Sequence, residues 1–196
     1  MNKKSRTWII IAAIALVLIL WGVRRYNNFV TLDEGVTNQW SNVENVYQRR
    51  ADLIPNLVNT VKGYADFEQE TLTQVIEARA KATSVNVDAN NLTPESIAAF
   101  QQAQEGLGNA LSRLLVTIER YPELKANQNF LELQSQLEGT ENRIAVERRK
   151  FNETVRGYNT ATRRFPANII AGLGGFDQKG YFEAADGSET APVVEF

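Results

Sequence analysis

TLDEGVTNQWSNVENVYQRRADLIPNLVNTVKGYA, residues 31–65, is the stretch that decides the fold of this 196-residue chain. Its apolar side chains recur at alternating intervals of four and three residues, a spacing typical of one face of a helix. That face consists of Val36, Trp40, Val43, Tyr47, Arg50, Ile54, Leu57, Val61 and Tyr64. At about 1.5 Å per residue, a helix of this length spans about 52 Å. The pattern predicts one long amphipathic helix from Thr31 to Ala65.

Two residues do not fit an ideal helix of this kind. Pro55 removes one backbone donor and crowds the carbonyl of Ala51, so we expect a bend between these two residues. Arg50 occupies a position that is otherwise apolar. Such an arginine is either paired inside a bundle or extends its charged end to the edge of the core.

Three further helices are predicted downstream. The first covers residues 68–84. The second begins at Thr93-Pro94-Glu95, which supplies a capping hydroxyl, a proline at the first helical position and an acid at the positive helix end. The third runs from about residue 127 to 165. Because the connections between these segments are short, we expect an all-α fold in which about four helices, two of them long, form an elongated antiparallel bundle.

Polar residues on the inner faces of these helices are the candidate site. If Thr31 and Phe165 lie at the same height, Arg50 falls opposite residue 146 or so, and Gln104 lies nearby. We therefore expect a polar layer of Arg50, Gln104 and Arg148, with Glu141 about two turns further from the membrane. The two arginines need a carboxylate to balance their charge, and Glu141, Asp52 or Glu147 could supply it. We interpret this layer as an ion-pair set that fixes helix register, and a ligand site is the alternative.

A membrane anchor is predicted at residues 7–25, after a short segment of residues 1–6. Residues 8–23 carry no charge, basic residues flank them, and Trp8 and Trp21 suit the two interfaces. A cleavable signal peptide is the alternative, but no small-x-small pattern precedes Arg24. Three basic residues before the span and two after it favour a cytoplasmic N terminus, with the bundle on the other side.

The chain changes character after Phe165. Residues 165–176 are apolar, glycine-rich and too short to span a bilayer, so they either enter the membrane surface or cap the bundle. Basic residues outnumber acidic ones between Arg143 and Arg164, which favours an anionic surface. The predicted surface contact comprises Arg24, Arg25, Arg163, Arg164, Phe165, Ile169, Ile170, Leu173 and Phe176. The bundle is assigned to residues 26–182, and residues 183–196 form a flexible acidic tail.

Composition excludes several functions. The chain contains no cysteine and no histidine, so thiolate nucleophiles, imidazole bases and histidine metal ligands are absent. The formal net charge of -2 and the absence of an aromatic-plus-basic motif give no case for nucleic acid. We expect no cofactor, no metal and no small-molecule substrate. The leading hypothesis is a non-enzymatic, membrane-anchored scaffold with protein partners, self-association included; the alternative is an anion-binding sensor that uses the polar layer.

The chain resembles the LemA family of bacterial membrane proteins between Val36 and Phe182. The resemblance is carried by residues 49–58, 61–65, 121–127 and 140–144, and by Phe165-Pro166 with Gly175-Phe176. Phe151-Asn152 stands where tyrosine-asparagine is expected. The resemblance implies one membrane helix, an antiparallel helical domain and no catalytic residues. It also places the protein in the bacterial cytoplasmic membrane.

Overall fold

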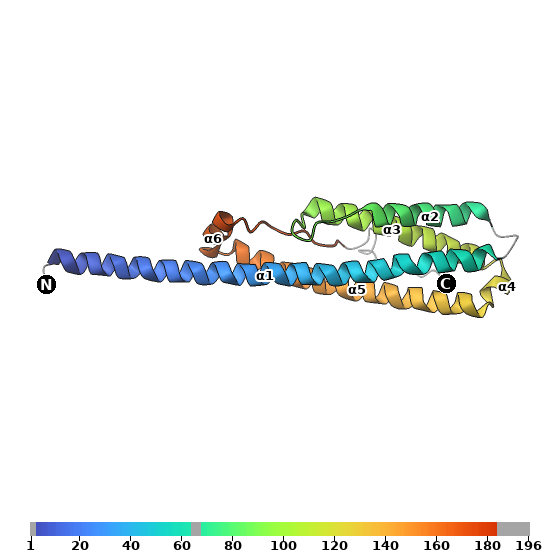
Figure 1. The fold of residues 1–196 in the computed structure, drawn as a ribbon, viewed down its shortest axis with the longest axis horizontal. Helices are drawn as coiled ribbons and strands as arrows, with labels where there is room; N and C mark the ends of the chain where they lie inside the picture. The colour runs from blue at the N-terminus through green and yellow to red at the C-terminus, as the bar shows by residue number, and fades with distance from the viewer. Residues whose placement is uncertain (1–2, 64–67, 184–196) are drawn as a thin grey trace, which may run out of the picture.

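The computed structural model describes residues 3–63 and 68–183, and every regular element within them is helical (Figure 1). The predicted all-α class is therefore confirmed. The helices are α1 (Lys3–Lys62), α2 (Gln69–Ser84), α3 (Pro94–Ile118), α4 (Pro122–Lys125), α5 (Gln128–Arg163) and α6 (Ala167–Gly174). The predicted helix-terminal residues Tyr64 and Ala65 and the tail from residue 184 onward lie outside the described residues.

Helix α1 is continuous from the predicted anchor segment, residues 7–25, into the bundle. It contains 60 residues, which corresponds to a length of about 90 Å. Within its Ser5–Lys62 part, an 18-residue window has a mean hydropathy of 2.2 and no buried residue, so the helix is long and apolar enough to cross a membrane. Thr31 is therefore an interior residue and not a helix start. The helix also continues through Pro55, and the expected bend there stays a prediction.

The helices alternate in direction along the long axis of the molecule. Helix α1 leads away from the anchor, α2 returns, α3 leads away again, and α5 returns beside α1 (Figure 1). The principal packing is between α1 and α5, and α2 with α3 forms the second pair. This arrangement is the expected antiparallel bundle.

Apolar residues of all four long helices fill two core clusters. The distal cluster contains Ile54, Leu57 and Val61 of α1 with side chains from α2, α3 and α5. The cluster nearer the anchor is aromatic: the Trp40 ring lies 5.2 Å from Phe100 and 5.6 Å from Phe151, measured between centroids. The alternating spacing in the sequence thus corresponds to a buried interface along the whole bundle.

Side-chain caps fix where α3 and α5 begin. The Thr93 hydroxyl accepts a hydrogen bond from the Ser96 N–H at 3.2 Å, with Pro94 at the first helical position. The Asn127 side chain accepts one from the Phe130 N–H at 3.1 Å. Both caps satisfy donors that a helix leaves without intrahelical partners.

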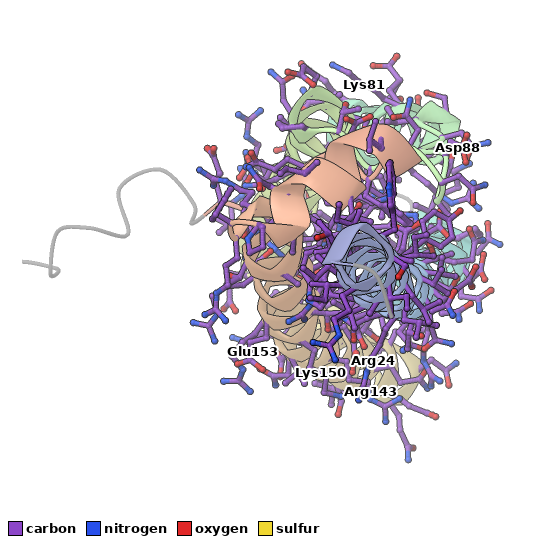
Figure 2. The ribbon with its side chains drawn as sticks, turned by 90° about the vertical axis from the view of Figure 1, so that its left-hand side faces the viewer. Arg24, Lys81, Asp88, Arg143, Lys150 and Glu153 are labelled. Carbon is purple, nitrogen blue, oxygen red and sulfur yellow. The ribbon has the colours of Figure 1, made fainter. Side chains whose placement is uncertain are left out.

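Helix α6 lies beside α1 at the anchor end of the bundle, and Figure 2 views the molecule from this end. It packs on both α1 and α5. Its last turn ends at Gly175, whose φ of 72° is left-handed and suits a residue without a side chain. From there residues 176–183, which we call the C-terminal strap, run back along the bundle (Figure 1).

Candidate functional site

Arg50 forms the centre of a buried polar layer. Arg50 is 3% exposed, and its guanidinium lies 5.1 Å from the centre of the Tyr47 ring, one turn earlier on α1. Arg50 Nη1 donates to Glu141 Oε1 of α5 at 2.7 Å. Arg50 Nη2 donates to the side-chain and backbone oxygens of Gln104 in α3, at 2.7 and 3.1 Å.

The layer extends to the fourth long helix through Gln104. The Gln104 amide donates to the carbonyl of Ala82 near the end of α2, at 3.3 Å. One residue from each of four helices therefore joins a single chain of hydrogen bonds. Because the hydrogen-bonded groups come from helices far apart in sequence, the layer is satisfied in only one relative register of the bundle.

Arg148 is not at the centre of this layer, although its side chain lines the same small cavity as Arg50, Gln104 and Glu141. It lies seven residues beyond Glu141, about two turns nearer the anchor, where its guanidinium is 4.9 Å from the Phe182 ring and Nη2 donates to the Glu183 carbonyl at 2.7 Å. The expected height match assumed that the bundle begins at Thr31. Phe29 is in fact buried against α6, so the paired part of α1 begins lower, and Glu141 lies opposite Arg50.

Two groups near the layer, Tyr47 and Glu147, have a shifted pKa. Burial raises the pKa of Tyr47, an effect that the nearby Arg148 and Arg50 guanidinium groups only partly offset. Glu147, a second candidate carboxylate, accepts hydrogen bonds from Gln39 at 2.7 Å and Lys150 at 2.8 Å, and these lower its pKa. Asp52 accepts a hydrogen bond from the Gln48 amide at 2.8 Å.

A second arginine compensates for Pro55. Proline has no N–H, so the Ala51 carbonyl lacks its normal helical partner. Arg79 of α2 fills this position: its Nε donates to the Ala51 oxygen at 2.8 Å. The sequence alone did not link Arg79 to Pro55. The signal available was an arginine on an inward face with no acidic partner at helical spacing.

The C-terminal strap is bound by side-chain amides. Asn159 of α5 both donates to the Lys179 carbonyl, at 2.9 Å, and accepts from the Lys179 N–H, at 3.0 Å. Asn152 bonds both backbone groups of Phe182 in the same way, at 2.8 and 2.9 Å. Gln101 of α3 repeats the pattern with Glu183, at 3.2 and 3.0 Å. Glu183, expected in the flexible tail, is therefore held at its backbone.

Two side chains of the strap are also anchored. Phe182 is buried, with its ring 6.0 Å from Trp40 and 5.4 Å from Phe151. Lys179 Nζ pairs with Asp33 of α1 at 2.9 Å. Gly180 passes so close to α3 that a Cβ there would lie 2.7 Å from the Pro94 Cα, so only glycine fits.

The residues expected at the membrane surface divide into two groups. Ile170 and Phe176 are half-buried and pack with the residues around Phe29 of α1. The remaining members are exposed: Arg24, Arg25, Arg163, Arg164, Phe165, Ile169 and Leu173.

The space beside the polar layer is small and open at one side. A cavity of about 200 Å³ is lined by Tyr47, Arg50, Gln104, Glu141 and Arg148, among others. Within residues 3–63 and 68–183, no group of three or more acidic side chains could hold a metal ion. The arrangement can bind an anion or fix the helices, and it assembles no nucleophile with a base.

The fold and this site define a helical bundle built on a membrane-type helix. The LemA family model matches residues 39–196, and the chain belongs to the LemA family. The resemblance found in the sequence is thus confirmed.

Curated relatives extend the similarity into the anchor. The chain is 28% identical over 206 residues to magnetosome protein MamQ 2 of Paramagnetospirillum magneticum, covering 94% of this chain and 72% of that protein. The same identity and length relate it to magnetosome protein MamQ of Magnetospirillum gryphiswaldense, with 94% and 73% covered. Protein LemA of Metamycoplasma hominis is 24% identical over 149 residues, 76% of this chain and 64% of that protein. None of these names designates an enzyme, and the matches fit a membrane-anchored helical protein.

Proposed function

We propose that this protein is a non-enzymatic, single-pass scaffold of the bacterial envelope that acts by associating with other proteins, copies of itself included. The observation that carries the proposal is the uninterrupted helix α1. A helix that continues from the span into the core couples the direction of the bundle to the membrane. Such coupling suits a protein that presents surfaces at a set distance from a bilayer.

The polar layer supports this proposal because its strongest donors are already occupied. Arg50 uses both terminal nitrogens on protein oxygens, so an anion could bind these two nitrogens only by displacing Glu141 or Gln104. The layer then serves helix register, which a scaffold requires.

Crosslinking in native membranes, followed by identification of the attached chains, tests the scaffold. We expect discrete adducts of defined mass, and the size of the detergent-solubilised protein distinguishes self-association from other partners. Adducts should disappear when the crosslinker is quenched before the membranes are added. A chain that remains monomeric at every crosslinker concentration contradicts the proposal.

We further propose that the span crosses the cytoplasmic membrane with its N terminus inside. The basic residues before the span support this orientation. Asn90 is exposed in the loop between α2 and α3, and the chain has no native cysteine. Asn90→Cys should react with an impermeant thiol reagent on cells whose outer barrier is opened. Labelling only after lysis would show the opposite orientation, with the bundle in the cytoplasm.

An anion sensor is the second candidate, and one observation favours it. Arg50 Nε is buried and has no hydrogen-bond partner in the part of the chain that the structure describes. A small oxyanion in the adjoining cavity would supply one. A thermal-shift series with phosphate, sulfate and acetate should then raise the melting temperature of the native chain but not of Arg50→Met. No shift with any of them excludes the sensor.

A further inference from the structure

Helix α6 has two faces of different kinds. Its inner face, Ala167, Ile170 and Ala171, packs with Phe29. Its outer face carries Ile169 and Leu173 at an interval of four residues, and Phe165 precedes the helix in the turn after α5. No part of the described chain covers this apolar stripe of three side chains. The exposed fractions of this stripe are 82% for Phe165, 54% for Ile169 and 83% for Leu173.

Contacts with α1 fix the height of α6. A Cβ built on Gly22 would lie 3.6 Å from Ile170 Cδ1. The Tyr26 ring lies 5.3 Å from Phe176, and a Cβ on Gly174 would lie 3.2 Å from the Tyr26 ring. Helix α6 therefore lies against residues 22–29 of α1, where the uncharged run of residues 8–23 ends.

Exposed arginines lie close to α6 in the sequence of α1 and α5, near the end of the uncharged run. Arg24 and Arg25 of α1 are exposed directly after the apolar run, and Arg24 is labelled in the view from the anchor end (Figure 2). Arg163 and Arg164 are exposed at the end of α5, directly before Phe165. Apolar side chains bordered by arginines at the end of a membrane span are typical of a segment at the lipid headgroups.

We propose that the outer face of α6, with Ile169 and Leu173, and Phe165 in the turn before it enter the headgroup–acyl boundary of the bilayer that α1 spans. The inference rests on the proposed membrane placement of α1. The bilayer is the occupant that the geometry favours, because α6 is held at the end of the span and the neighbouring arginines of α1 and α5 match anionic headgroups. The anchor would then have a second, lateral contact that braces the bundle on the membrane.

Single cysteines in the full chain test the proposal, because the native chain has none. Each variant carries an environment-sensitive fluorophore and is reconstituted into vesicles of phosphatidylcholine and phosphatidylglycerol that contain a lipid-borne quencher. Leu173→Cys reports on α6, and Leu16→Cys reports on the span. Val116→Cys is the matched aqueous control, since Val116 is an apolar side chain of α3 that is 71% exposed.

We expect the Leu16 and Leu173 probes to be quenched severalfold more than the Val116 probe. If Leu16 is quenched and Leu173 behaves like Val116, the contact of α6 with lipid is wrong while the anchoring stands. If Leu16 is not quenched, the anchoring itself fails, and the inference fails with it. A Leu173 probe that is shielded from water but not quenched would show that a protein surface, such as a second copy, covers α6.

Discussion

At the scale of single residues, Arg50 illustrates why a charge occurs in an apolar seam. A buried ion pair adds little stability over packed apolar side chains, but removing one partner is strongly destabilising because it leaves a buried charge without compensation. The terminal nitrogens of Arg50 have their hydrogen-bond acceptors only when Glu141 and Gln104 are both in place. The layer thus penalises any bundle in which α3 or α5 slides along α1.

We predict that Glu141→Ala destabilises the bundle by about 1.5–3 kcal/mol, the usual contribution of a hydrogen bond to a charged group. The loss stays below the roughly 3–5 kcal/mol of a fully buried pair because the Glu141 side chain is 49% exposed and water can partly replace it. Thermal unfolding of the detergent-solubilised chain, followed by circular dichroism, measures the change.

Two variants serve as controls for this prediction. Arg50→Met combined with Gln104→Leu removes the buried charge together with its buried partner and should cost less than Glu141→Ala. Arg149→Ala alters an exposed arginine of α5 and should change stability by less than about 0.5 kcal/mol. If Glu141→Ala and Arg149→Ala behave alike, the layer is not under the constraint described here.

Pro55 and Arg79 allow a second test at this scale, because their roles are linked through the Ala51 carbonyl. Arg79→Met removes the charged donor and should cost about 1.5–3 kcal/mol. In a Pro55→Ala background the restored backbone N–H bonds Ala51, so the same change should cost about 1 kcal/mol less. Unfolding of the four chains of this cycle gives the coupling energy, with Lys81→Met as the exposed control on α2. Additive effects would show that the two residues are independent.

At the scale of elements, the periodic part of the fold was predictable and the irregular part was not. The seams of α1, α3 and α5 follow from intervals of three and four residues, which also bring Arg50 and Gln104 to one height. The error in register arose because charge and composition separate the anchor from the bundle, whereas the helix does not end between them. The assumption that Thr31 and Phe165 lie at the same height was therefore wrong.

The C-terminal strap was missed for a different physical reason. Its segment has no repeating pattern, and part of its attachment to the bundle comes from Asn152 and Asn159, which bond backbone groups of the strap. Backbone recognition leaves no signature in the sequence of the bound segment. The spacing of seven residues between the two asparagines on one face of α5 was the available signal.

We predict that Asn152→Ala releases the strap locally. The variant leaves the Phe182 N–H and carbonyl without partners, so hydrogen exchange at the Phe182 amide should become faster, while that of core amides in α1 is unchanged. Exchange measured by mass spectrometry or NMR gives the result. Asn142→Ala, at an exposed position of the same helix, is the matched control. Equal exchange at Phe182 in both variants would show that packing of the ring alone holds the strap.

At the scale of the whole molecule, helix α1 sets the length of the protein, and the C-terminal strap and α6 pack along it. About 39 residues of α1 separate Val23 from Lys62, which places the far end of the bundle about 58 Å beyond the span. Lys179 joins Asp33 of α1 to the loop at Asn90, with Nζ 2.9 Å from Asp33 Oδ1 and 3.5 Å from the Asn90 carbonyl. That loop is thus held near residue 33, about 15 Å beyond Val23.

We predict from these heights that the bundle stands upright on the bilayer. In nanodiscs with acceptor-labelled lipids, a donor on Asn90→Cys should transfer energy strongly, and one on Glu123→Cys, exposed in α4 at the far end, only weakly. Asn28→Pro offers a contrast: Asn28 is an exposed residue of α1 just beyond the span, in the stretch that α6 contacts, and proline there costs about 3 kcal/mol and removes a helical hydrogen bond. Transfer from Glu123→Cys should rise in that background, because the bundle can then tilt toward the lipid. Equal transfer from the two positions in the native background would mean that the bundle lies along the membrane, and that α1 ends at the bilayer instead of continuing beyond it.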